Sequence, residues 1–75
     1  MPTDREKLRT LTKIEGCGTV MELLELSAAD CVCPAICMND GCDYTAEMEP
    51  DQDRGWCEEC GTNSMKSALI LGGII

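Results

Sequence analysis

Four cysteines stand in two short pairs, and their type and spacing are what indicate chemistry in this sequence. The first pair is Cys37 and Cys42, and the second is Cys57 and Cys60, with fourteen residues between the pairs. Thiolate sulfur is a preferred ligand of zinc, and two pairs separated by the length of a hairpin are the usual spacing of a four-cysteine zinc site. The sequence therefore predicts one structural Zn²⁺ ion bound by these four cysteines.

The residues within each pair support this prediction. The second pair reads Cys57-Glu-Glu-Cys60-Gly61. A Cys-x-x-Cys turn places two sulfurs on one side of the chain, and the following glycine lets backbone N–H groups approach the thiolates. In the longer first pair Gly41 gives the turn similar freedom. Cys33 is the alternative partner of Cys37, but we prefer Cys42 because it stands at the start of a predicted strand.

The sequence leaves two alternatives open: a second metal site formed by the remaining cysteines, and a metal other than zinc at the main site. Cys17 and Cys31 lie on or beside predicted helices and are interpreted as small buried hydrophobic residues. A second metal site made of Cys17, Cys31 and Cys33 is an alternative, although their spacing is irregular. Iron is the alternative metal at the main site. A rubredoxin-like iron site has two Cys-x-x-Cys-Gly turns, however, and this chain has one, so zinc is favoured.

A closed site of four thiolates indicates a structural role rather than catalysis. It leaves no position at which a metal could activate water. The sequence also has no histidine, and its carboxylates are scattered, so no nucleophile–base pair can be assembled. We therefore predict a protein that is not an enzyme. A thiol oxidoreductase that uses Cys57 and Cys60 is a less favoured alternative, because no βαβ pattern surrounds the pair.

Two helices are predicted ahead of the cysteine pairs. Residues 3–15 open with Thr3 and a Glu three residues later, which is a capping box, and a second box opens at Thr19. The second helix has residues of one face at intervals of three and four, namely Val20, Leu23, Leu24, Ser27, Ala28 and Cys31. We expect the two helices to form a helical hairpin over residues 1–32 that packs on the metal-binding part.

Strands are predicted between the cysteine pairs. Residues 43–49 alternate, with Tyr44, Ala46 and Met48 on one face, which is typical of a half-buried strand. Residues 50–55 have turn composition, and the next two residues open a return strand. Pairing of these two strands in a β-hairpin would bring the cysteine pairs together. After the second pair, Asn63 or Ser64 is expected to cap a short apolar helix over residues 65–71.

These elements predict a small α+β protein with a helical hairpin, a zinc-ribbon β-hairpin with four cysteine ligands, and a short C-terminal apolar helix. One domain is expected over residues 1–75, with the helical hairpin in residues 1–32 and the ribbon and last helix in residues 33–75. The chain has one Trp, one Tyr and no Phe, so its core is small. Structural zinc in small domains contributes about 10–16 kcal/mol of apparent binding energy, which here would also be folding energy.

Charge narrows the class of partner. The formal net charge is −8, and residues 17–75 hold most of the acids with only two basic residues. Phosphate contacts need clustered cations, so a protein partner is favoured over nucleic acid. A nucleic-acid-associated regulator that uses Arg5, Arg9 and Lys13 is the alternative. An acidic surface that imitates DNA is a weaker idea, because it depends on charge alone.

The compartment and the apolar tail are further expectations. An odd count of seven cysteines and a start without an apolar signal segment favour a reduced cytoplasmic protein over a secreted disulfide scaffold. The apolar run of residues 68–75 is far shorter than the roughly 20 residues that cross a bilayer, so no membrane association is expected. Its large residues are expected to be buried on the helices or, failing that, to contact a partner or a second copy of the chain: Leu69, Ile70, Leu71, Ile74 and Ile75.

The second half of the chain resembles a known group of proteins. Over about residues 36–75, the segments Cys37-Met-Asn-Asp-Gly-Cys42, Gly-Trp-Cys57-Glu-Glu-Cys60-Gly and Ala-Leu-Ile-Leu look like small, largely uncharacterised zinc-ribbon proteins of bacteria and their phages. The resemblance implies ligand roles for the four cysteines and implies no reaction. We therefore expect a non-enzymatic zinc-binding interaction or regulatory protein, of the kind that serves as an accessory or inhibitor protein.

Overall fold

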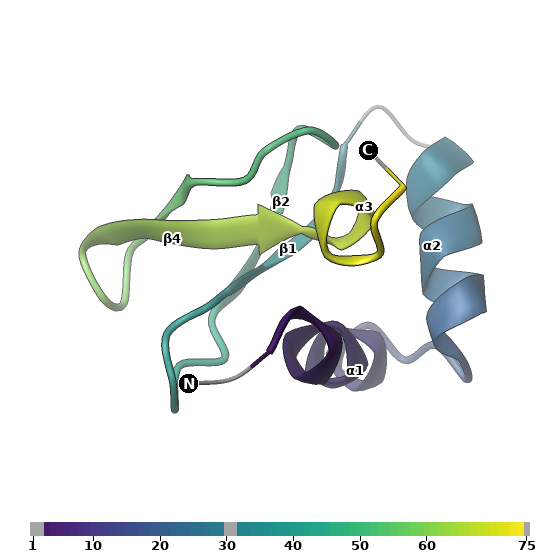
Figure 1. The fold of residues 1–75 in the computed structure, drawn as a ribbon, viewed down its shortest axis with the longest axis horizontal. Helices are drawn as coiled ribbons and strands as arrows, with labels where there is room; N and C mark the ends of the chain where they lie inside the picture. Colours follow the sequence, from purple (N-terminus) through teal and green to yellow (C-terminus); the bar gives the residue numbers. More distant parts are fainter. Residues whose placement is uncertain (1–2, 30–31, 75) are drawn as a thin grey trace.

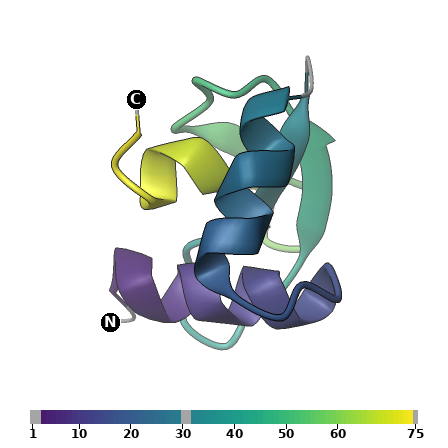
Figure 2. The same ribbon diagram turned by 90° about the vertical axis from the view of Figure 1, so that its right-hand side faces the viewer.

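The computed structural model describes residues 3–29 and 32–74. Its elements are α1 (Asp4–Ile14), α2 (Val20–Ala29), β1 (Cys33–Cys37), β2 (Thr45–Met48), β3 (Gly55–Cys57), β4 (Thr62–Ser67) and α3 (Ala68–Leu71). The strands form one antiparallel sheet in the order β2-β1-β4-β3. The three helices lie together on one side of this sheet (Figures 1 and 2). The predicted α+β class with two N-terminal helices is confirmed.

The two N-terminal helices begin where their caps predict. The Thr3 hydroxyl accepts a hydrogen bond from the Glu6 N–H at 3.1 Å, and the Thr19 hydroxyl accepts one from the Glu22 N–H at 3.1 Å. Each cap satisfies an amide that has no partner within its helix. Figure 2 shows α2 rising steeply across α1, so the two helices form a corner rather than an antiparallel pair.

The pairing of the strands corrects the predicted ribbon. The expected hairpin between residues 43–49 and the return strand does not form. Instead β2 pairs with β1, from Cys33↔Met48 to Ile36↔Thr45, and β3 pairs with β4. The strands β1 and β4 pair with each other at the centre of the sheet. The strand β1, which contains Pro34, is not among the elements predicted from the sequence.

The predicted C-terminal helix is also only partly present. Residues 65–67, expected to be helical, belong to β4, and α3 has only the four residues Ala68–Leu71. Neither Asn63 nor Ser64 is the cap: the Ser67 hydroxyl accepts the hydrogen bond from the Ile70 N–H at 3.3 Å. Ser67 also donates its hydroxyl to Pro50 O and its N–H to Gln52 O. These bonds fasten the loop between β2 and β3 to the end of β4.

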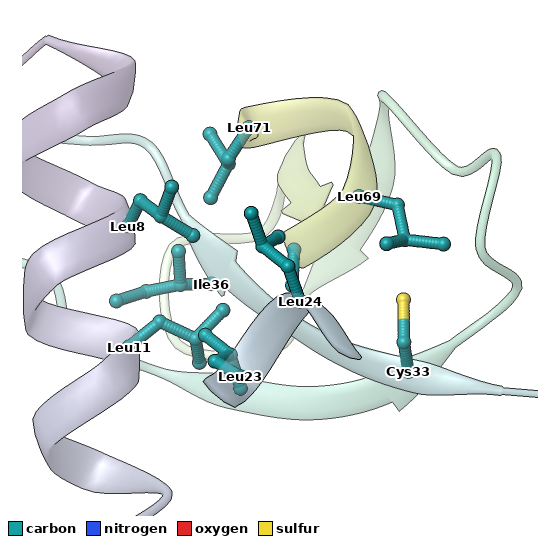
Figure 3. Packing of buried hydrophobic residues seen from close by; sticks show 9 residues of the cluster. Leu8, Leu11, Leu23, Leu24, Cys33, Ile36, Leu69 and Leu71 are labelled. Carbon is teal, nitrogen blue, oxygen red and sulfur yellow. The ribbon is translucent and has the colours of Figure 1, made fainter. Parts of the chain in front are cut away.

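The core consists of two clusters that meet at β1. The larger cluster joins the three helices to the sheet (Figure 3) and comprises Leu8, Leu11, Leu23, Leu24, Cys33, Ile36, Ala68, Leu69 and Leu71. The smaller cluster is formed by residues of the strands β1, β3 and β4 and comprises Ala35, Cys37, Cys57 and Met65. Strand β1 therefore contributes buried residues to both clusters and ties the helical part to the cysteine-bearing part.

The apolar tail is mostly buried, as expected. Leu69 and Leu71 pack in the larger cluster, Ile70 is half-buried, and Ile74 is 60% exposed. Ile75 lies outside the described residues. Within residues 3–29 and 32–74, no helix has both the length and the apolar character needed to cross a membrane.

Candidate metal centre

Each cysteine pair lies where one hairpin turns. Cys37 ends β1 and Cys42 follows it before β2, while Cys57 ends β3 and Cys60 follows it before β4. Because β1 and β4 are antiparallel neighbours, the turn after β1 and the turn before β4 lie at the same end of the sheet. Two hairpin turns therefore bring the pairs together, rather than the single hairpin that the sequence suggested.

Two glycines shape these turns. Gly41 has φ of +79° and Gly61 has φ of +67°, a left-handed conformation that glycine adopts without the steric cost of a Cβ. Gly41 immediately precedes Cys42, and Gly61 immediately follows Cys60. In the second turn the Gly61 N–H donates to Cys57 O at 2.8 Å. Both glycines thus allow the chain to reverse sharply beside a cysteine.

The sulfur geometry fits a tetrahedral metal ion. The four Sγ atoms all lie within 4.8 Å of one another, and the Cys37–Cys60 and Cys42–Cys57 Sγ separations are each 3.8 Å. A tetrahedron with Zn–S bonds of about 2.3 Å has S–S edges of about 3.8 Å, whereas a disulfide bond is about 2.05 Å long. The cysteines of this cluster are all free thiols. The prediction that they lie together is confirmed, and they are positioned to bind a metal ion.

Backbone amides surround the sulfurs. The Cys60 N–H donates to the Cys57 sulfur at 3.4 Å. The backbone N–H groups of Glu59, Asn39 and Tyr44 act to lower the pKa of the Cys57, Cys37 and Cys42 thiols, respectively. In each case the N–H group belongs to the residue two positions after the cysteine. Such donors stabilise thiolate charge and orient metal ligands.

The thiol pKa values respond to burial and to these donors. Burial would raise the pKa of Cys37, but hydrogen bonds from the Ser64 hydroxyl and the Asn39 backbone outweigh it and lower this pKa to about 7. Burial, above all, raises the pKa of Cys57. A backbone hydrogen bond from Tyr44 lowers the pKa of Cys42, but the neighbouring thiols and burial raise it overall. Without a cation between them, the clustered thiols do not all ionise together, so metal binding must release protons.

A polar network beside Cys37 was not predicted from the sequence. The Ser64 hydroxyl lies 3.2 Å from the Cys37 sulfur, and the Asn39 side-chain amide donates to the hydroxyls of Ser64 and Thr62 at 3.3 and 3.2 Å. Asn39 belongs to the first turn, while Thr62 and Ser64 belong to β4. This network links the two hairpins independently of the sulfurs. The polar run Thr62-Asn63-Ser64, shortly after the second cysteine pair, was the available signal for it.

Lys7 is the other functional neighbour that sequence reasoning missed. It is a buried residue of α1 whose ammonium donates to Asn39 O at 2.9 Å and to Cys42 O at 2.6 Å, and which lies 3.5 Å from an Asp43 carboxylate oxygen. The first helix is thereby fixed to the loop that carries Cys42. Its positive charge also lies beside a cluster that becomes negative when the thiols ionise.

The other cysteines lie away from this cluster. Cys33, the alternative ligand, is buried in the larger core cluster with the helices. Cys17 is half-buried beside the same cluster, and burial, followed by the charges of Glu22 and Glu15, raises its thiol pKa. Cys31 lies outside the described residues. Over residues 3–29 and 32–74, the four-cysteine group is the one cluster of metal-binding side chains, so the second metal site finds no support there.

Comparisons of this chain with models of protein families, with curated proteins and with solved structures find no match. The resemblance to bacterial and phage zinc-ribbon proteins therefore stays a prediction that depends on the cysteine pattern. The fold and the site define a small α+β protein with a four-thiol cluster positioned to bind a metal ion. The function has to be argued from this site and from the surfaces around it.

Proposed function

We propose that this protein is a non-enzymatic interaction module of the cytoplasm whose fold is held by one structural Zn²⁺ ion. Cys37, Cys42, Cys57 and Cys60 are the ligands in this proposal. The observation that carries it is the pair of 3.8 Å Sγ–Sγ separations within one cluster of four thiols, which match the edges of a zinc tetrathiolate.

The donor set favours zinc as the ion. Four thiolates with backbone N–H donors are typical of structural zinc sites, and zinc has no geometric preference that would distort the tetrahedron. Iron bound by four thiolates is coloured and redox-active, whereas zinc bound in this way is colourless. Absorption spectroscopy of the purified protein, together with elemental analysis, therefore distinguishes the two metals.

The closure of the cluster supports a structural rather than a catalytic role. Four protein ligands occupy all four coordination positions of a tetrahedral ion and leave none for water. A nucleophilic dithiol usually has one acidified and accessible cysteine, whereas here the acidified Cys37 is fully buried and burial raises the pKa of Cys57. The function is therefore assigned to the outer surface, which carries the net charge of −8.

Metal analysis of cysteine variants tests the site. We expect about one zinc ion per chain in the wild type, loss of the ion in Cys57→Ser, and full retention in the control Cys17→Ser, because Cys17 lies outside the cluster. Retention of zinc by Cys57→Ser, or bound iron in the wild type, would overturn the assignment.

Binding and turnover assays test the proposed class. The zinc-loaded protein should retain a protein partner and show no turnover of disulfide substrates. Steady reduction of such a substrate by wild type but not by Cys57→Ser would replace the proposal with a thiol oxidoreductase. Salt-sensitive binding to DNA or RNA in place of a protein would replace it with a nucleic-acid regulator.

A further inference from the structure

We propose that a groove between α1, α2 and α3 is the partner-docking site, and that it binds a protein segment in which an Asp or Glu carboxylate is flanked by apolar side chains. This inference depends on the proposed function as an interaction module and adds the chemistry of the partner. Three observations carry it: an apolar floor, two arginines beside it, and the absence of ion pairs for those arginines within the described residues.

The groove has an apolar floor. Its volume is about 640 Å³, within the range of about 300–1,000 Å³ that is common for ligand sites. The apolar lining comes from all three helices, through Leu8 of α1, Val20 and Leu24 of α2, and Leu71 of α3. Figure 2 shows these helices side by side on one face of the molecule. Each contributes part of a surface that an apolar side chain of a partner can cover.

Gly72 allows α3 to approach the floor closely. A Cβ at this position would lie 2.8 Å from Leu24 Cδ2, which is closer than van der Waals contact allows. A side chain at residue 72 would therefore require the Leu24 side chain to shift within the groove. The shape of the groove is thus built into the packing of the helices.

The acidic residue of the groove has an ion-pair partner, whereas its two arginines have none within the described residues. Asp4, Arg5 and Arg9 line the groove. Asp4 is paired with Lys66 at 3.4 Å. Within residues 3–29 and 32–74, the structure has two ion pairs, Asp4 with Lys66 and Lys7 with Asp43. Neither arginine therefore has a carboxylate partner in the described residues. In a chain with 14 acidic and 6 basic residues, two such exposed arginines beside an apolar groove mark a site for a negative group.

The spacing of the arginines suits carboxylates. Arg5 and Arg9 are four residues apart on α1, so their side chains emerge on the same face. A guanidinium binds a carboxylate through two parallel hydrogen bonds. A polynucleotide fits less well, because the acidic chain repels its phosphates. An acidic and apolar peptide segment satisfies both parts of the groove.

Peptide selection followed by calorimetry tests this proposal. The zinc-loaded full chain is immobilised and used to select from a phage-displayed library of random dodecapeptides, and the enriched peptides are synthesised. We expect enrichment of Asp or Glu next to Leu, Ile or Phe. We also expect the double variant Arg5→Ala/Arg9→Ala to bind these peptides about tenfold more weakly or worse, because charge-assisted hydrogen bonds are lost.

A matched control separates the groove from general charge. Lys13→Ala/Arg54→Ala removes the same charge from exposed residues outside the groove, so its affinity should stay close to that of the wild type. Val20→Glu places a carboxylate on the floor and should also weaken binding. Val20 is half-buried and packs against the helical cluster, whereas an acid is favourable in the first turn of a helix, so circular dichroism of this variant checks that its fold is kept.

Several outcomes would overturn the proposal. They are enrichment of basic or purely apolar peptides, no enrichment, equal loss of affinity in the two double variants, and binding of an oligonucleotide to Arg5 and Arg9 instead of peptides. If a native protein partner binds Arg5→Ala/Arg9→Ala as it binds the wild type, the groove is excluded while the interaction module stands. Catalytic turnover, or retention of nucleic acid alone, would exclude the module itself.

Discussion

Lys7 illustrates how a single side chain joins two parts of this protein. It is only 4% exposed, although lysine is seldom fully buried without partners. Its partners are two loop carbonyls, Asn39 O and Cys42 O, and the exposed carboxylate of Asp43. Because Lys7 itself is buried, these bonds replace the hydration that the ammonium loses. The residue therefore stabilises the first cysteine turn from a helix more than 30 positions away in sequence.

Replacement of this lysine should destabilise the protein. Lys7→Met keeps the aliphatic stem but leaves two loop carbonyls without their donor, which should lower the free energy of unfolding by about 1–3 kcal/mol. Chemical denaturation at a fixed excess of zinc measures this change. Lys13→Met is the control, because Lys13 is exposed on the same helix and should change stability by less than about 0.5 kcal/mol. Equal effects of the two substitutions would contradict the role assigned to Lys7.

Ser64 should contribute to the metal affinity of the cluster. Ser64→Ala removes the hydroxyl that lies 3.2 Å from the Cys37 sulfur, and loss of a partner of a metal ligand typically weakens binding by about 10–100-fold. Competition with a chromophoric chelator measures the affinity. Thr10→Ala is the control, because the Thr10 hydroxyl bonds only its own helix at Glu6 O. An unchanged affinity in Ser64→Ala would show that the sulfur does not depend on this hydroxyl.

At the scale of elements, local signals predicted local structure. The starts of α1 and α2 follow from Thr3 and Thr19, because each cap involves residues only three positions apart. The cysteine turns follow similarly from their spacing and glycines. Sequence reasoning also placed Cys42 in the cluster and Cys33 outside it, as the structure has them. Each of these features is determined by residues that lie close together in the sequence.

Strand pairing depends on distant residues and was not predictable in the same way. Proline has no backbone N–H and is therefore unexpected within a sheet. Met38, however, donates its N–H to Ser64 O of β4, and the N–H groups of alternate residues in a strand point to the same neighbouring strand. Pro34 therefore faces the β4 side, where pairing begins only at Ala35↔Ser67. No ladder hydrogen bond is lost at the proline. The last three residues of β4, Met65 to Ser67, were assigned to the helix because they run directly into the apolar residues of α3.

The second cysteine turn should require glycine at position 61. Gly61→Ala places a Cβ in a left-handed conformation and should cost about 1–2 kcal/mol. Gly18→Ala is the matched control: its Cβ would meet nothing closer than a Glu22 carboxylate oxygen at 3.7 Å, and it should be neutral or slightly stabilising. Thermal unfolding of the zinc-loaded variants measures both. A loss of stability in Gly18→Ala as large as in Gly61→Ala would contradict a conformational origin.

At the scale of the whole molecule, two small cores depend on one strand. The cluster within the sheet has four buried residues, two of which are the cysteines Cys37 and Cys57, so its packing alone is slight. The helical cluster is larger but uses Cys33 and Ile36 from β1. Because β1 leads directly into the first cysteine turn, the order of the helical part should depend on the metal centre.

Removal of the metal should therefore unfold both parts together. Trp56 is the one tryptophan of the chain and is 54% exposed beside Cys57, so its fluorescence reports on the metal centre, while far-ultraviolet circular dichroism reports mainly on α1 and α2. On titration with a chelator, we expect both signals to change over the same range, because zinc binding energy is folding energy in a chain with so small a core. Cys17→Ser is the control and should follow the wild type. A helical signal that persists after the Trp56 signal has changed would contradict a single domain over residues 1–75 and show that the helical part folds alone.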